Sequence, residues 1–336
     1  MRIMAFSRNS LRKVGIVSML TVKRNAKIKT DVALKKSMSK EAVAGIVFVL
    51  PAVIFICVFL VLPALLAFGY SFQQYNMLKP AQKVFIGLTN YIDVLKNPAF
   101  YKSLFNTVYF AAIVVPLQTI VALGLALLVN KKLKTSKIAR ICFFSPVVTS
   151  MVVVAILWTF LYNKDSGLIN SLLNSIGIQS QPFLLSEKQA MNSIIFMSIW
   201  QAAGYQMMIF LAGLQDVPEE LYEAAKVDGA NAFQTFTKIT LPYMLYVTTP
   251  YLIVTFTGNV NNFNVIYLLS GGDPVTNLSS TAGKTDLLVT WLYKLTIDKQ
   301  YYNIGAVIGI MTFIILAIGC LLTYRNSKSY KEEGGF

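Results

Sequence analysis

Six long stretches of this sequence carry no charged residue and consist mainly of apolar side chains. An α-helix needs about 20 apolar residues to cross a hydrocarbon core about 30 Å thick, and each stretch is long enough. Because 55% of its residues are hydrophobic and only 13% are charged, the chain is not an ordinary soluble globule. The sequence therefore predicts an all-α integral membrane protein with a six-transmembrane-helix bundle. The expected spans are residues 42–78, 103–130, 141–163, 189–215, 239–272 and 300–324.

The distribution of basic residues predicts how this bundle is oriented. With six spans both termini lie on one side, and the segments on that side contain 21 of the 30 lysines and arginines. The positive-inside rule places both termini in the cytoplasm. The formal charge of +15 is then explained by basic residues that set the orientation in the membrane and by their attraction to anionic lipid. We expect no nucleic-acid partner, although a basic surface alone would suit one.

The spans divide the chain into three parts. Residues 1–41 form a basic cytoplasmic tail, residues 42–324 the six-helix transmembrane domain, and residues 325–336 a second cytoplasmic tail. An apolar patch from Val14 to Val22 resembles a signal peptide, but it has no small-residue cleavage pattern and is followed by two basic residues. We therefore expect the first segment to remain as a tail, with a turn or two lying on the membrane surface.

The side-chain inventory argues against an enzyme. Histidine is absent, which excludes imidazole catalysis, a Ser-His-Asp triad and a histidine-ligated metal. Cys57, Cys142 and Cys320 all fall inside expected spans, where they read as small packing residues and form neither a disulfide framework nor a zinc site. We expect no catalytic residue, no metal site and no cofactor on this chain.

The loop between the fourth and fifth spans, residues 216–242, is predicted to form two short helices around a sharp turn. Asp216 and Glu219 make a capping-box-like start, and acidic residues there favour the positive end of the helix dipole. Gly229 can end the first helix, and Asn231 can cap the second. Small residues at the bend permit close approach by another protein.

The charge of this loop separates two interpretations of it. The loop contains five acidic residues and only two lysines, so it is an acidic element on a basic cytoplasmic face. It could be an amphipathic connector that rests on the membrane, or a docking element for a partner with basic contacts. Interfacial helices are usually basic, so the sequence favours docking.

The same loop resembles the EAA loop of ABC-importer permeases. It contains Glu223-Ala224-Ala225, three further residues, Gly229, nine residues, Ile239, one residue and Leu241-Pro242, which agrees with that pattern at every specified position. The resemblance extends over about residues 44–325 and implies the ABC importer type I permease fold in a bacterial cell membrane. It also implies that an ATPase subunit docks on Glu223, Ala224, Ala225, Asp228 and Gly229.

The resemblance implies a set of partners as well. Such a permease works with a second permease subunit, two cytoplasmic ATPase subunits and an extracytoplasmic sugar-binding protein. ATP and Mg would then bind the ATPase partner, and hydrolysis would take place there. This chain would be the transport subunit, and not an enzyme.

Two further segments resemble carbohydrate importers. Residues 261–272 and 282–288 are similar to the larger permease of maltose transporters, the MalF-like branch of the binding-protein-dependent family. This chain lacks the two additional N-terminal spans and the large external domain found there. The resemblance implies a maltodextrin-like oligosaccharide as the solute. Another solute delivered by a binding protein, such as glycerol phosphate, stays open, as do a self-contained secondary transporter and a structural membrane protein.

The fourth and fifth spans contain an unusual number of neutral polar side chains. An amide facing lipid would lose its hydrogen bonds, so these groups should face a cavity or another helix. Amides also hold helices together across bundle interfaces, and residue patterns alone do not decide between the two roles. The MalF-like resemblance implies that the sugar path includes Ser198, Gln201, Tyr205, Thr255, Asn259 and Asn262, whereas Gly204 and Gly258 are expected at close approaches or kinks.

The loop before the last span is predicted to contain one further helix. Thr285 can cap it, and Leu287, Leu288, Trp291, Leu292 and Leu295 form an apolar stripe along it. We expect this helix to lie along the outer mouth, with Trp291 at the membrane interface.

Overall fold

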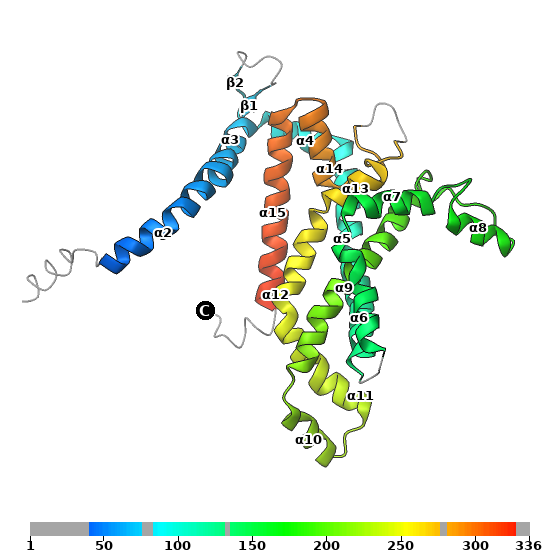
Figure 1. Ribbon diagram of the computed structural model, residues 1–336. Helices are drawn as coiled ribbons and strands as arrows, with labels where there is room; N and C mark the ends of the chain where they lie inside the picture. The colour runs from blue at the N-terminus through cyan, green and yellow to red at the C-terminus, as the bar shows by residue number, and fades with distance from the viewer. Residues whose placement is uncertain (1–39, 76–82, 132–134, 276–280, 327–336) are drawn as a thin grey trace, which may run out of the picture. The chain divides into compact units, whose positions relative to one another are not determined.

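The computed structural model of the protein describes residues 40–75, 83–131, 135–275 and 281–326 (Figure 1). The predicted tails, residues 1–41 and 325–336, lie almost entirely outside the described residues. The chain divides into two compact units, residues 1–65 and residues 66–336, and each is described by itself.

The first unit holds a single described helical segment. Helix α2 (Lys40–Ile56) continues through a π-helical turn, η1 (Cys57–Val61), into the start of α3 (Leu62–Ser71). Its apolar side chains are exposed along this whole length; Phe48, for example, is 87% exposed. Such a surface is stable in lipid or against another protein, in agreement with the predicted first span.

Membrane-length helices account for five of the six predicted spans among the described residues. They cover Ala42–Ser71, Pro98–Asn130, Ala190–Gln215, Ala232–Ser270 and Tyr302–Leu322. The third predicted span is sharply bent. Helices α6 (Ser136–Val148) and α7 (Met151–Leu161) meet there at 98°, because Thr149 and Ser150 between them adopt extended backbone conformations. The pair completes the six spans when it is counted as one.

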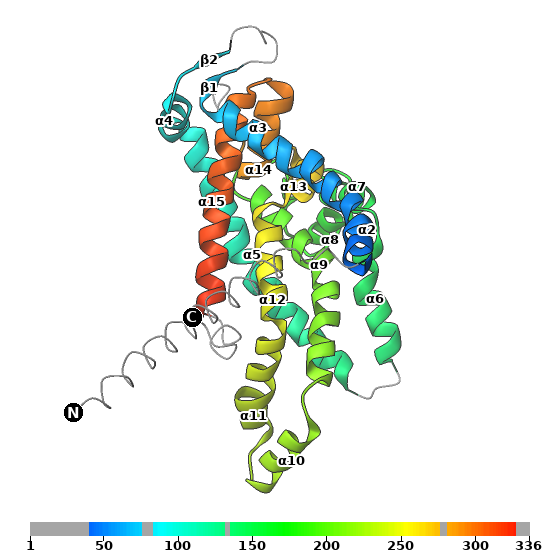
Figure 2. The same ribbon diagram turned by 90° about the vertical axis from the view of Figure 1, so that its left-hand side faces the viewer.

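Three long helices pack closely in the second unit (Figure 2): α5 (Pro98–Asn130), α9 (Ala190–Gln215) and α12 (Leu241–Val260). Gly204 lets α9 approach α6, because a Cβ atom there would collide with the backbone carbonyl of Phe143. The prediction of a close approach at Gly204 is thus correct. The apolar core between the three helices consists of Ala122, Ala126, Val129, Met207, Phe210, Leu211, Leu214 and Met244.

Shorter elements gather at the upper end of the second unit in Figure 1. These are α4 (Thr89–Lys96), α7, α8 (Leu168–Ser175), α13 (Phe263–Ser270), α14 (Leu288–Tyr293), the π-helical turn η3 (Lys294–Asp298) and the start of α15 (Tyr302–Asn326). Strands β1 (Gln73–Gln74) and β2 (Val84–Phe85) form a small antiparallel hairpin, the one sheet among the described residues.

Helix α14 departs from the sequence-based expectation at two residues. Trp291 is fully buried, with its indole N–H donating to the Thr281 hydroxyl at 3.0 Å, so its expected place at the membrane interface is wrong. Thr285 does not cap the helix, because its hydroxyl donates to the Asp273 carbonyl at 2.7 Å. Thr290 instead accepts a hydrogen bond from the backbone of Leu287 at the first turn. The predicted apolar stripe does pack inward around these residues.

The opposite end of the second unit carries the predicted helix-turn-helix (Figure 1). Helix α10 (Glu219–Val227) precedes α11 (Ala232–Thr235), which continues through the π-helical turn η2 (Phe236–Thr240) into α12. Asn231 caps α11 in a full capping box with Gln234, as predicted. The capping-box-like start at Asp216 is wrong, because Pro218 takes the N-cap position of α10 and no side chain caps that helix.

Candidate functional site

An open cavity of about 440 Å³ lies where α5, α9 and α12 meet, beside the junction of α12 with α13. The chain breaks its helical path at Asn261 and Asn262, and this break turns a cluster of amide side chains towards one place. Its lining residues share neutral, polar or aromatic character. They are Gln118, Ala202, Tyr205, Tyr251, Val254, Thr255, Gly258, Asn259, Asn261, Asn262, Phe263 and Asn264.

Four of the six residues predicted for the sugar path line this cavity. Tyr205 comes from α9, Thr255 and Asn259 from α12, and Asn262 from the break after α12. The structure therefore brings together groups from two spans that the sequence separates by about 50 residues.

The other two predicted residues lie outside the lining. Ser198 is buried at 3% exposure, and its hydroxyl donates to the Ile194 carbonyl of its own helix at 2.7 Å. Gln201 is half-buried and also does not line the cavity. The polar character of Ser198 is satisfied locally by back-bonding within α9, a use of serine that a sequence pattern does not reveal.

The hydrogen bonds of Asn259 and Thr255 bear on whether these groups hold helices together. The Asn259 amide donates to the Thr255 carbonyl at 2.9 Å, and the Thr255 hydroxyl donates to the Tyr251 carbonyl at 3.0 Å. Both bonds stay within α12, so neither side chain links α12 to another helix. Each side chain also keeps an oxygen atom that can accept a hydrogen bond from a solute.

Tyr251 marks the boundary between two cavities. It lines the 440 Å³ cavity and also a second cavity of about 300 Å³, which lies between α9 and α12 towards the α10 end. Its ring is 5.8 Å from the ring of Tyr205, at an interplanar angle of 56°. The two tyrosines therefore stand at the point where a path through the bundle would pass from one cavity to the next.

Gly258 and Gln118 are cavity residues whose role the sequence reasoning missed. Gly258 was expected at a close approach or kink, but a Cβ atom there would meet nothing within 4 Å. Gln118 is an amide within the apolar run of the second span, two residues after Pro116. An amide close to a proline within a spanning helix is the signal that could have identified it.

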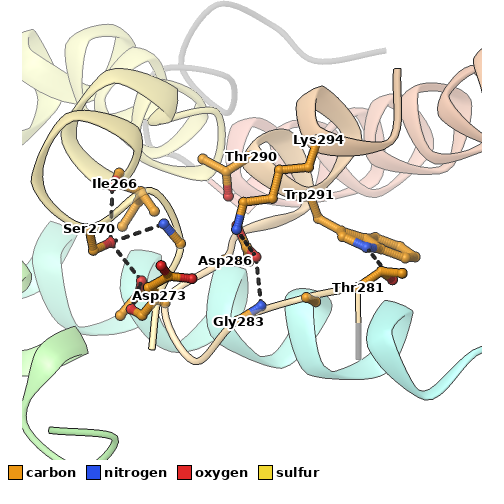
Figure 3. A network of polar contacts seen from close by, with 12 residues as sticks. Ile266, Ser270, Asp273, Thr281, Gly283, Asp286, Thr290, Trp291 and Lys294 are labelled. Atoms are coloured by element: carbon orange, nitrogen blue, oxygen red, sulfur yellow. Dashed lines mark hydrogen bonds and ion pairs between the residues drawn. The ribbon is translucent and has the colours of Figure 1, made fainter. Parts of the chain in front are cut away.

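Charged side chains form a separate network at the upper end of the second unit, away from the cavity lining (Figure 3). The Asp286 carboxylate is fully buried and accepts hydrogen bonds from the Gly283 backbone at 2.7 Å and from the Lys294 ammonium at 2.8 Å. Asn106 of α5 donates to the carbonyls of Lys284 and Asp286 at 3.0 Å. This network fixes the loop after α13 against α5 and α14.

The predicted docking loop is exposed. Glu223, Ala224, Asp228 and Gly229 are exposed, whereas Ala225 is buried at 6% exposure. Gly229 has a φ of +72°, a left-handed conformation that favours glycine, so its predicted role as the turn residue is confirmed. The tip also presents two large apolar side chains, Val227 at 87% and Phe233 at 75% exposure.

Comparison with known proteins identifies the family. Residues 118–326 match the family described as binding-protein-dependent transport system inner membrane component. This chain belongs to that family. The permease is a multi-pass membrane protein, and its predicted membership of the carbohydrate ABC-importer permeases is confirmed by its relatives.

Two curated relatives align with nearly the whole permease. One is the arabinooligosaccharides transport system permease protein AraP of Bacillus subtilis, which is 34% identical and aligned over 88% of this chain and 92% of its own length. Another is the trehalose/maltose transport system permease protein MalF of Thermococcus litoralis, 34% identical over 88% of this chain and 96% of its own.

The fold is shared with a solved ABC transporter. A chain in the crystal structure of a bacterial alginate ABC transporter, in complex with an alginate pentasaccharide-bound periplasmic protein, superposes with a TM-score of 0.75. The match covers 86% of this chain and 95% of that chain at 24% identity. The predicted type I permease fold is therefore confirmed.

Proposed function

We propose that this permease forms the path of a neutral, maltodextrin-like oligosaccharide through an ATP-driven importer of the bacterial cell membrane. The observation that carries the proposal is the neutral lining of the 440 Å³ cavity: five amides, one threonine, two tyrosines and no charged residue. Sugar hydroxyls both donate and accept hydrogen bonds, so they match amide and hydroxyl groups, and aromatic rings suit the apolar faces of sugar rings. The names of the two relatives, which refer to arabinooligosaccharides and to trehalose and maltose, support the same class.

The lining argues against glycerol phosphate as the solute. A phosphate group is normally held by arginine, lysine or a helix N-terminus, because its charge needs compensation when it leaves water. None of the residues that line the cavity is basic, and the N-terminus of the eight-residue helix α13 at Phe263 is the one group there with a partial positive charge. The neutral oligosaccharide is therefore the better match.

The assembly that we propose contains a second permease subunit, two cytoplasmic ATPase subunits and an extracytoplasmic sugar-binding protein. The exposed loop with Glu223, Asp228 and Gly229 would dock on an ATPase subunit, with the apolar tip at Val227 and Phe233 buried in that contact. ATP and Mg would bind the ATPase partner, and both termini of this permease would face the cytoplasm.

Transport would follow alternating access. Closure of the ATPase subunits would move α10 and α11, and the motion would pass directly into α12, because α11, η2 and α12 are continuous. The bond of 3.1 Å between the hydroxyls of Tyr222 and Thr240 joins α10 to the same continuous helix. The sugar would enter the 440 Å³ cavity and pass Tyr251 into the lower one.

Uptake by the assembled complex tests this proposal. The permease is tagged, the complex is purified from the source membranes and reconstituted in liposomes with ATP inside and the binding protein outside. Uptake is compared for maltotriose, arabinotriose, glycerol 3-phosphate and an alginate trisaccharide. We expect ATP-dependent uptake of a neutral trisaccharide and none of the anionic solutes; uptake of only an anionic solute, or uptake without ATP, would refute the proposal.

A further inference from the structure

A polar layer crosses the apolar core just after Pro116 of α5. Gln118 and Thr119 of α5 and Gln206 of α9 lie in this layer, and the two glutamines are 2% and 0% exposed, respectively. A buried amide normally has hydrogen-bond partners, since leaving it unpaired is costly. The partners of these two amides differ, and the difference separates their roles.

Gln206 has a structural role. Its amide nitrogen donates to the Thr119 hydroxyl at 2.9 Å, and the Thr119 hydroxyl donates to the Val115 carbonyl at 2.7 Å. Gln206 therefore links α9 to α5. Its own side-chain oxygen is also buried without a partner among the described residues, but Gln206 does not line the cavity.

Gln118 lines the cavity instead. Its side-chain oxygen is buried and accepts no hydrogen bond from any described residue. The residue sits on α5, whereas Thr255 and Asn259 reach the same cavity from α12. The cavity thus has polar groups on two walls, and the α5 wall holds an amide oxygen without a protein partner.

We propose that Gln118 is a specificity-determining residue that hydrogen-bonds a hydroxyl group of the transported sugar. The inference rests on the proposed function and adds the α5 wall to the solute site. A sugar hydroxyl can both donate and accept, so it satisfies either end of the amide. A phosphate or carboxylate oxygen can accept from the amide nitrogen but cannot donate to the unpaired Gln118 oxygen, whereas a hydroxyl can do both.

Binding of the sugar would supply the partner that the buried Gln118 oxygen lacks. A sugar hydroxyl would pair with the side-chain amide, while an analogue without that hydroxyl would leave the amide unpaired. Gln118 would consequently discriminate a sugar from its deoxy analogue.

The test measures solute binding without the binding protein, whose own affinity would otherwise dominate uptake. Radiolabelled maltotriose, or arabinotriose if the wild-type complex takes up that sugar, is titrated onto the assembled complex in nanodiscs. Gln118→Met, Gln118→Asn and the matched control Gln206→Met are compared, together with a set of monodeoxy analogues of the same sugar. Each value is normalised to the amount of assembled complex.

We expect Gln118→Met to raise the Kd for the sugar about 2-fold to 12-fold, the range of one neutral hydrogen bond. The variant should also lose the discrimination against one particular monodeoxy analogue, a readout that a purely structural role would not change. Gln118→Asn keeps the amide but shortens its reach, so it should show a smaller loss. Gln206→Met should lower the yield of complex and leave the Kd per complex unchanged.

Two results would overturn the inference. An unchanged Kd and unchanged deoxy discrimination in both Gln118 variants, with a wild-type complex that binds and transports the sugar, would refute the role of Gln118 alone. A wild-type complex that neither binds nor transports any neutral trisaccharide would refute the proposed function together with this inference.

Discussion

The buried ion pair between Asp286 and Lys294 provides the sharpest stability prediction. The Asp286 side chain is fully buried, and the Lys294 side chain is 20% exposed. The Asp286 Oδ2 atom accepts two hydrogen bonds, while its Oδ1 atom has no donor among the described residues. Removing the lysine therefore leaves a buried carboxylate with a single backbone N–H as its hydrogen-bond donor among the described residues, and with the charge of Lys102 acting on it.

The expected cost depends on which partner is removed. Breaking a buried pair by removing one member costs about 3–5 kcal/mol, because the remaining charge is left uncompensated in a medium of low polarity. We expect that loss for Lys294→Met. Asp286→Asn should cost less, about 1–3 kcal/mol, since the partly exposed ammonium can still reach water. Asp286→Leu combined with Lys294→Met should cost less than the sum of its two single variants.

A second ion pair of the same region serves as the matched control. Lys284 and Glu187 are 3.5 Å apart, with side chains that are 38% and 47% exposed. An exposed pair of this kind contributes about 0–1 kcal/mol, so Lys284→Met should have little effect.

The assay is unfolding of the purified permease in mixed micelles, followed by tryptophan fluorescence and compared between variants at equal protein concentration. Trp291 packs in the core beside this network, so its emission reports on the region directly. The reasoning is refuted if Lys294→Met unfolds within about 1 kcal/mol of the wild type, or if Lys284→Met is the more damaging of the two.

Three further predictions concern the docking loop and the cavity. Gly229→Val should reduce sugar-stimulated ATP hydrolysis, because a side chain at its positive φ costs about 1–2 kcal/mol, whereas Gly229→Asn should largely retain it; equal rates for both would contradict the role of the turn conformation. Glu223→Lys should weaken co-purification of the ATPase subunit without loss of membrane insertion, and unchanged co-purification would argue against docking at this residue. Asn262→Ala should weaken sugar binding per assembled complex by about 0.5–1.5 kcal/mol, and a loss of assembly at unchanged affinity would make Asn262 a structural residue.

The sequence predicted those features that follow from local pattern. Apolar runs without charge revealed the spans, because a membrane imposes a minimum length on each. The turn at Gly229 and the cap at Asn231 were predictable, since both depend on the conformational preferences of single residues. The membrane family followed from the long and spaced pattern around Glu223.

Features that depend on tertiary packing were beyond these patterns. The bend between α6 and α7 arises from two non-helical residues, Thr149 and Ser150. The mean hydropathy of the apolar run does not detect them. Ser198 and Asn259 look alike in sequence as polar residues in apolar spans, and both hydrogen-bond back to their own helix, yet only Asn259 lines the cavity. Gln118 is a candidate for the solute site only because α5 packs beside α12 in the structure.

The central claim is that the solute passes through the cavity between α5, α9 and α12, and Gly258 offers the most direct test. A side chain at this position points into open space, so Gly258→Cys should fold normally. The variant is made in a background in which the native cysteines at positions 57, 142 and 320 are replaced by serine. Ile176→Cys, at the residue that follows α8, serves as an exposed control outside the cavity. Both complexes are labelled to completion with a bulky maleimide before ATP-dependent uptake of the neutral trisaccharide is measured. The account predicts that labelling at position 258 abolishes uptake and that bound sugar slows the labelling, with no effect at position 176; full uptake after complete labelling of position 258 would contradict it.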